Sequence, residues 1–137
     1  MPDPTTFSPS VRRFLTAPLR FAVIATSGAD GTPHQAVVWY ALDDAGILIN
    51  SLVGRRWPAD LQRDPRVALT VVDPDLEAER YVAVQAEAVV AATGEGAVRD
   101  IQDLARRYGS DPSSFEGLER ISFRLAPRSV TVHGDLD

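Results

Sequence analysis

The stretch FAVIATSGADGTPHQAVVWYAL, residues 21–42, decides the fold of this 137-residue chain. Its first part, Phe21–Thr26, is an apolar run with the β-branched residues typical of a buried strand. Its second part, residues 34–42, is another such run. Between the two runs, Asp30-Gly31 is the strongest turn signal in the chain. The stretch therefore predicts a β-hairpin.

Four further apolar runs predict the remaining strands. They are ILINSL at 47–52, RVALTVVD at 66–73, RYVAVQAEAVVAA at 80–92 and RISFRLAPRSVTVHG at 120–134. Because the run at 47–52 follows the tight turn DDAG, the first three strands are expected to form an antiparallel meander. Pro127 is expected to interrupt the last strand. Six strands in this order predict a mainly-β fold, a small antiparallel barrel that closes its edges.

Capping and spacing signals predict three helices. Ser8 can cap a short helix with Pro9 at its first position. A second short helix should span residues 58–63 and end before Pro65, which disfavours helical geometry in the preceding residue. One long helix is predicted by apolar residues at helical spacing, with Gly109 placed as its C′ glycine. Those apolar residues are Val98, Ile101, Leu104, Ala105 and Tyr108.

Composition predicts one domain over residues 1–137, with residues 1–7 loose. No apolar run approaches the length of a membrane span, and we expect no membrane partner. The start of the chain does not resemble a signal peptide, and it has no Cys, so a cytoplasmic location is expected. The net charge of −5 argues against a nucleic-acid partner.

The residue inventory restricts the chemistry. All 14 basic residues are Arg, so Schiff-base chemistry on Lys is excluded. The two His residues, His34 and His133, are far apart and have no carboxylate at a ligand spacing, so no metal site is predicted. No nucleophile motif or phosphate-binding glycine loop is present. The sequence therefore names no catalytic residue and no proton donor.

Two features could form a binding site. Arg55 and Arg56 precede a predicted helix, whose N-terminus favours anions, and Asn50 and Ser51 lie close by on the preceding strand. The alternative is a solvated helix start whose arginines pair with Asp60 or Asp64. Trp39-Tyr40 places two aromatic rings on opposite faces of a strand, so one can be core while the other lines a cleft. The alternative is a core residue beside a surface residue.

Three stretches, residues 21–42, 47–73 and 80–88, together resemble the pyridoxamine-phosphate-oxidase-like split β-barrel superfamily. Within it the chain is most similar to the actinobacterial flavin/deazaflavin oxidoreductases that use coenzyme F-420. The resemblance runs from about Val11 to His133. It implies a six-stranded split β-barrel, a homodimer, and a flavin-like ring in a cleft between the subunits.

The resemblance also implies the cofactor-binding residues. Those carried over by position are Pro33, Gln35, Val37 and Trp39 under the ring, Asn50, Ser51, Gly54, Arg55, Arg56, Trp57 and Leu61 along the phosphate-bearing tail, and Arg80 and Tyr81 from the second subunit. The family pattern reads GRRKxxNL, and this chain has Trp57 in place of the Lys and Asp60 in place of the Asn. The first change removes a positive charge and the second adds a negative one, and both are expected to weaken F-420 binding.

Three functions follow as hypotheses. The first is an oxidoreductase that passes a hydride from reduced F-420 to a small conjugated acceptor. The second keeps the fold and binds FMN, which has no polyglutamate tail and better tolerates the missing Lys. The third is a cofactor-free binding protein in which Trp57, Pro58 and Asp60 have closed the site. The sequence does not name the substrate.

Overall fold

The computed structural model describes residues 7–115 and 117–137. Its strands are β1 (Ala22–Ser27), β2 (Pro33–Val38), β3 (Ala41–Asp43), β4 (Gly46–Leu52), β5 (Arg66–Val72), β6 (Tyr81–Thr93) and β7 (Arg120–His133). Its helices are α1 (Pro9–Thr16), α2 (Arg56–Arg63) and α3 (Gly94–Arg107), with 3-10 turns at Leu76–Ala78 and Pro112–Phe115. Among the described residues no helix is both long and apolar enough to cross a membrane.

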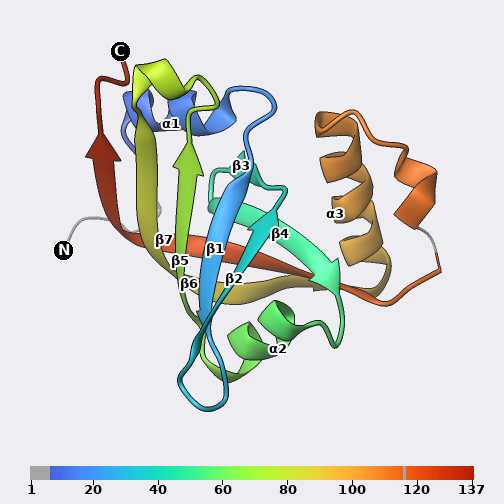
Figure 1. Ribbon diagram of the computed structural model, residues 1–137. Helices are drawn as coiled ribbons and strands as arrows, with labels where there is room; N and C mark the ends of the chain where they lie inside the picture. The colour runs from blue at the N-terminus through green and yellow to red at the C-terminus, as the bar shows by residue number, and fades with distance from the viewer. Residues whose placement is uncertain (1–6, 116) are drawn as a thin grey trace.

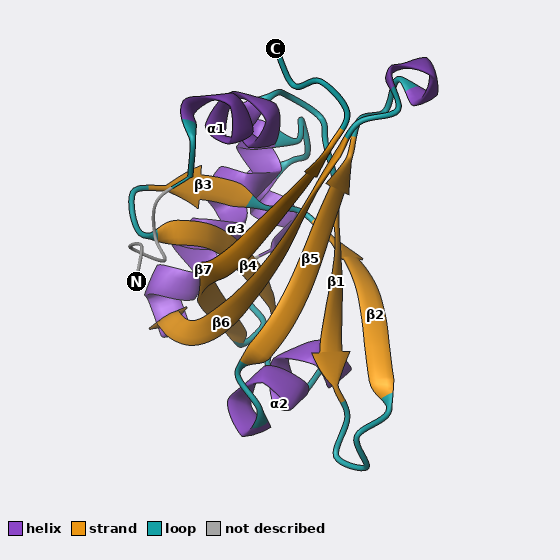
Figure 2. Ribbon diagram, turned by 90° about the vertical axis from the view of Figure 1, so that its left-hand side faces the viewer, coloured by secondary structure: helices purple, strands orange, loops and turns teal. Residues whose placement is uncertain are grey.

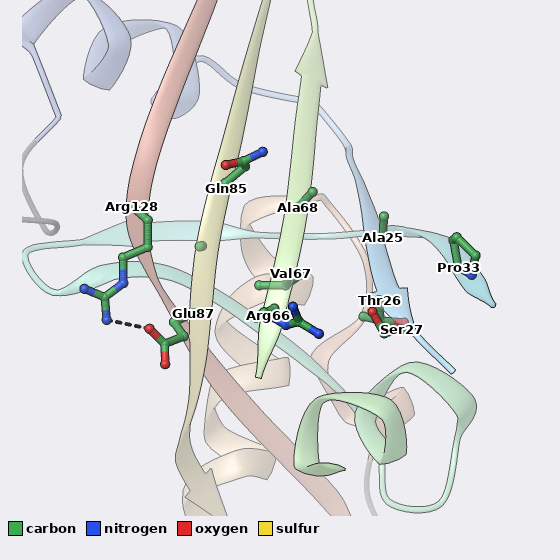
Figure 3. A pocket seen from close by; sticks show the side chains of 11 residues that line it. Ala25, Thr26, Ser27, Pro33, Arg66, Val67, Ala68, Gln85, Glu87 and Arg128 are labelled. Carbon is green, nitrogen blue, oxygen red and sulfur yellow. Dashed lines mark hydrogen bonds and ion pairs between the residues drawn. The ribbon is translucent and has the colours of Figure 1, made fainter. Parts of the chain in front are cut away.

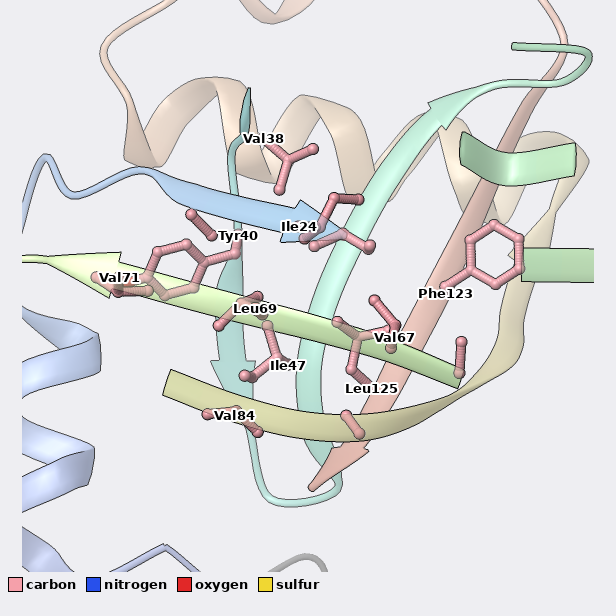
Figure 4. Close-up of a cluster of buried hydrophobic side chains, with 14 of the residues drawn as sticks. Ile24, Val38, Tyr40, Ile47, Val67, Leu69, Val71, Val84, Phe123 and Leu125 are labelled. Carbon is pink, nitrogen blue, oxygen red and sulfur yellow. The ribbon is translucent and has the colours of Figure 1, made fainter. Parts of the chain in front are cut away.

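The strands form one antiparallel sheet in the order β2-β1-β5-β6-β7-β4-β3 (Figure 1). Figure 2 shows β6, β5, β1 and β2 side by side, with α1 and α2 at opposite ends of these strands. The inward-facing side chains of the curled sheet form the core, which includes Ile24, Ile47, Leu69, Val84 and Leu125 (Figure 4). The mainly-β prediction is confirmed.

The predicted closed six-stranded barrel is wrong, because the strand expected at 34–42 is two strands. Tyr40 interrupts it: its amide donates to the Tyr108 hydroxyl at 3.2 Å, and its carbonyl accepts from Arg107 Nε at 3.1 Å. A backbone that bonds to helix side chains cannot continue a strand ladder. The chain therefore passes from β2 at one edge of the sheet to β3 at the other, and the seven-stranded sheet stays open.

The predicted meander is correct only for its local hairpins. β1 pairs with β2, with Ser27 opposite Pro33, and β3 pairs with β4, with Asp43 opposite Gly46. The remaining partners are distant in sequence, because β1 also pairs with β5 and β4 also pairs with β7. β2 and β4 do not pair with each other within the described part of the sheet.

Pro127 does not interrupt the last strand. β7 continues through it, and the register with β6 shifts so that Gln85 faces Ser129 while Ala86 faces Pro127. Arg128 is the extra residue, as in a β-bulge, and a bulge tolerates the N–H that proline lacks.

The helices agree with the sequence signals except at one boundary. Ser8 caps α1 by accepting from the Val11 amide at 3.2 Å, and Gly109 follows α3 with φ +73°. α2 begins at Arg56, two residues before the predicted start. Pro58 is thus its third residue, where the missing N–H still breaks no bond, because the first helical bond joins the Ala59 amide to the Arg55 carbonyl at 3.1 Å.

Candidate functional site

A cleft opens between the unpaired edge of β2 and residues 49–52 of β4, which extend beyond β3, and it holds a pocket of about 320 Å³. We call it the cleft pocket. Its described lining residues are Val37, Val38, Trp39, Asn50, Ser51, Leu52, Arg55, Trp57, Ile101, Phe115 and Arg120. Because neither strand edge has a partner strand here, the split in the sheet itself creates the pocket.

The charge of the cleft pocket is positive. Arg55 and Arg120 both line it, and no Asp or Glu does among residues 7–115 and 117–137. Neither arginine takes part in an ion pair with a described carboxylate. Burial, together with the charge of Arg55, lowers the pKa of Arg120. A site with two uncompensated cations favours an anionic ligand.

Asn50 holds Arg120 in place and is itself fully engaged. Arg120 donates to Asn50 Oδ1 at 3.0 Å, and Asn50 Nδ2 donates to the Ala97 carbonyl and to Ser122 Oγ, each at 2.8 Å. Ser122 in turn donates to Asp100 Oδ2 at 2.7 Å. Asn50 is 9% exposed, so it serves to join β4, β7 and α3 and to orient Arg120.

Aromatic rings form another wall of the cleft pocket. Trp39 stacks on Tyr108 with ring centroids 5.1 Å apart and meets Phe115 edge-on at 5.9 Å. Tyr40 points the other way into the core, where its hydroxyl donates to the Leu15 carbonyl at 2.6 Å and burial raises its pKa to about 12. One aromatic residue is therefore core and the other lines a cleft, which was the first of the two alternatives.

The adjacent arginines diverge. Arg55 lines the cleft pocket, whereas Arg56 lies beside the β1–β2 turn, its guanidinium 3.8 Å from where a Cβ on Gly28 would stand. In that turn the Thr32 amide, and to a lesser extent the Arg56 charge, lower the pKa of Asp30. The two side chains thus do not act on one ligand from within a single protomer's pocket.

The two departures from the family pattern have different positions. Trp57 is 7% exposed, packs on Phe123 with ring centroids 5.9 Å apart, and lines the floor of the cleft pocket. Asp60 lies outside the pocket lining and accepts from Thr26 Oγ1 at 2.9 Å and from Arg63 at 2.8 Å. Burial opposes the ionisation of Asp60, but these two bonds outweigh it and lower its pKa. Asp60 therefore anchors α2 to β1.

The thirteen residues implied by the resemblance lie in several places. Six of them line the cleft pocket: Val37, Trp39, Asn50, Ser51, Arg55 and Trp57. Pro33 lines a shallow pocket of about 500 Å³ on the outer face of the sheet (Figure 3). Arg80 and Tyr81 line a separate pocket of about 270 Å³ at the start of β6. Gln35, Gly54, Arg56 and Leu61 do not line the cleft pocket, and Leu61 is core.

Sequence reasoning missed five lining residues of the cleft pocket: Val38, Leu52, Ile101, Phe115 and Arg120. Arg120 reaches the cleft pocket because β4 and β7 pair with Leu52 opposite Arg120. That register joins residues far apart in the chain, and no local motif announces it. A single Arg at the start of a predicted strand gave no signal of this role.

A family model described as pyridoxamine 5′-phosphate oxidase matches residues 7–134. The chain belongs to the pyridoxamine 5′-phosphate oxidase family. Among curated protein sequences none matches significantly. The recognised superfamily is thereby confirmed, and the split sheet is the form that the fold takes in this family member.

Solved structures similar to this family member differ in what they are named for. An F-420 reductase is 23% identical with a TM-score of 0.73, over 87% of this chain and 94% of that one. A conserved hypothetical protein from Mycobacterium tuberculosis is 22% identical with a TM-score of 0.77, over 94% and 86%. The heme storage protein HutZ from Vibrio cholerae is 19% identical with a TM-score of 0.74, over 91% and 93%. These likenesses establish the fold alone.

Proposed function

We propose that the protein is an oxidoreductase that binds a phosphate-bearing flavin-type cofactor, F-420 or alternatively FMN, in the cleft pocket. The observation that carries this proposal is the pair of uncompensated cations, Arg55 and Arg120, beside the exposed part of Trp39. Arg120 Nε is also buried without a hydrogen-bond partner among the described residues. Cations with unused donors fit a phosphate, and an aromatic wall fits a ring.

The chain's own residues would bind and orient such a cofactor. When bound, it supplies hydride transfer to or from a small conjugated substrate. Arg55 and Arg120 would hold its anionic group, and Trp39, fixed by its stack on Tyr108, would limit the position of the ring. Val37 is 68% exposed and lines both the pocket and the outer face of the sheet, so the pocket opens toward that face.

A heme would fit the cleft pocket less well. Its described lining residues include no His, Tyr, Met or Cys that could ligate the iron. His133 instead stacks on Tyr81 with ring centroids 5.0 Å apart, outside the cleft pocket. The heme proteins among the structural neighbours therefore supply a control ligand rather than a second proposal.

The site is proposed to be completed by a homodimer. The register of β1, β5, β6 and β7 places small or uncharged residues together on the outer face of the sheet. They are Val23, Ala25, Ala68, Thr70, Val72, Tyr81, Ala83, Gln85, Ser129 and Thr131. The charged residues of this face, Arg66, Glu87 and Arg128, lie at the end of the strands next to α2. The rest of the exposed face is uncharged, and an uncharged exposed face favours a second copy of the chain.

The experiment is a fluorescence titration of the purified protein with F-420, FMN and, as a control, hemin followed at its Soret band. Micromolar or tighter binding of F-420, followed by oxidation of reduced F-420 with a panel of quinones and enones, supports the proposal. Binding of FMN alone assigns the protein to the flavin alternative. Binding of neither would contradict the proposal and favour the cofactor-free binding protein.

A further inference from the structure

Arg120 is a partly buried cation of the cleft pocket that has no carboxylate partner among the described residues. Its pKa is lowered by burial first and by Arg55 second. Its only side-chain hydrogen bond among the described residues goes to Asn50 Oδ1 at 3.0 Å, a neutral acceptor. Desolvating a cation beside another cation costs stability unless a counter-charge is present.

Three other half-buried arginines have a counter-charge. Arg124 lies on the same strand and is paired with Asp43 at 2.7 Å. Arg80 is paired with Asp73 at 2.5 Å, and Arg20 approaches the same carboxylate at 3.5 Å. At these three positions the fold supplies a carboxylate, and at the half-buried Arg107 it supplies the Tyr40 and Leu15 carbonyls. At Arg120 it supplies an amide oxygen and the face of the Phe115 ring, 5.1 Å from the guanidinium.

The contacts of Arg120 also fix its direction. The Asn50 side chain is held by the Ala97 carbonyl and by Ser122, so it presents its oxygen to Arg120 in one orientation. The Phe115 ring covers a face of the guanidinium. A guanidinium held in this way keeps its other N–H groups ready for a ligand at little entropic cost.

We propose that Arg120, together with Arg55, anchors the phosphate group of the cofactor in the cleft pocket, and so makes binding depend on that phosphate. The inference rests on the proposed function, because the phosphate is that of the cofactor. It adds that Arg120 serves the phosphate and does not contact the ring. Two arginines neutralise the negative charge of a phosphate group, and the planar fork of each matches phosphate oxygens in geometry.

The test compares FMN with riboflavin, which differ only in the phosphate, and F-420 with its deazaflavin core, which lacks the phosphate and the tail attached through it. Dissociation constants are measured for FMN and riboflavin, and for F-420 and its phosphate-free deazaflavin, with the wild type, Arg120→Gln and the matched control Arg124→Gln. Arg120→Gln should weaken binding of the phosphorylated ligands by about tenfold to a hundredfold, and of the phosphate-free ones by less than about threefold. Arg124→Gln should leave both sets of constants nearly unchanged.

Thermal melting of the ligand-free protein separates the two roles of Arg120. A purely structural role predicts a lower melting temperature for Arg120→Gln, and the anion-binding role does not. Arg120→Gln removes an uncompensated cation, so its melting temperature should equal or exceed that of the wild type. Arg124→Gln breaks an ion pair and should melt lower. A lower melting temperature for Arg120→Gln with an unchanged phosphate preference would overturn the inference, as would equal weakening of phosphorylated and phosphate-free ligands.

Inorganic pyrophosphate separates this inference from the proposed function. If pyrophosphate raises the melting temperature of the wild type and not that of Arg120→Gln while no cofactor binds, the anion site stands and the proposed function fails. If a cofactor binds with the same phosphate preference in both proteins, the proposed function stands and the role of Arg120 is refuted.

Discussion

Neighbouring residues of this chain have unlike roles because their side chains point to different surroundings. Arg55 lines the cleft pocket, and Arg56 lies by the β1–β2 turn. Trp39 lines the same pocket, and Tyr40 is fully buried in the core. Motif matching treats each pair as a unit, whereas the structure separates its members. The separation leads to predictions for single side chains.

Arg55→Ala should weaken binding of F-420 or FMN by about tenfold or more, since it removes a charged contact to the phosphate. Arg56→Ala should change the constant by less than about threefold, because Arg56 lies outside the cleft pocket. Fluorescence titration of the two single variants decides the matter. Equal losses would show that both arginines reach the ligand, as the sequence pattern implies.

Asp60 predicts a pH dependence of stability. Its folded pKa is lowered, so its contribution is fully present above about pH 4 and is lost as the pH falls through the folded pKa. Asp60→Asn should reduce the free energy of unfolding at pH 7 by about 1–3 kcal/mol. The deficit should shrink below about pH 4, where the wild-type carboxyl becomes protonated. Urea unfolding at several pH values measures it.

Asp103→Asn is the matched control for Asp60. Asp103 and Arg106 are also three residues apart on a helix, with their atoms 2.7 Å apart, but both side chains are exposed. An exposed pair contributes little, about 0–1 kcal/mol, so this variant should show almost no pH-dependent deficit. Equal deficits in the two variants would mean that burial of Asp60 has no energetic consequence.

At the scale of elements, α3 determines where the chain leaves β2 and begins β3. Its last residue, Arg107, and the next residue, Tyr108, bind the backbone carbonyl and amide of Tyr40, which ends β2 before β3 begins. This break leaves one edge of β2 and residues 49–52 of β4 without a partner strand, and the cleft pocket lies between them. The C-terminal end of α3 therefore shapes the candidate site mainly by hydrogen bonding to the backbone of Tyr40.

The β3–β4 hairpin should be intolerant of a side chain at Gly46. A Cβ there would lie 2.3 Å from the Leu125 carbonyl oxygen, and φ is +143°. Gly46→Ala should cost about 2–5 kcal/mol, from overpacking together with backbone strain. Gly31→Ala has φ +84° but open space around the new methyl, and should cost only about 1–2 kcal/mol. Similar losses in calorimetry would indicate that β4 shifts to make room.

At the scale of the whole molecule, the open sheet presents an outer face whose middle is uncharged, with Arg66, Glu87 and Arg128 at one end. The resemblance implies a partner subunit. Arg80 and Tyr81 lie away from the cleft pocket of their own chain, at the start of β6. The resemblance implies that these two residues contact the cofactor of the other subunit. A second copy of the chain packed on the outer face would allow that contact. Assembly and binding should therefore be lost together.

Ala68→Arg should convert the protein to a monomer, because Ala68 is exposed between Ala25 and Gln85 in the middle of the outer face. A buried, unpaired charge at an interface opposes association. Ala59→Arg, on the exposed side of α2, is the matched control and should leave the mass unchanged. Sedimentation equilibrium measures both masses. A monomeric wild type, or an Ala68→Arg dimer, would contradict the proposed assembly.

The sequence by itself determined the features that depend on neighbours a few residues apart. The β1–β2 hairpin, the Ser8 cap and the C′ glycine of α3 follow from turn and cap chemistry, and the family follows from its motifs. Only the tertiary structure decided the cut at Tyr40 and the place of Arg120 beside Asn50. Those contacts join residues 68 and 70 positions apart. They depend on how α3 packs against the sheet and how β7 pairs within it, and local sequence propensity does not determine either.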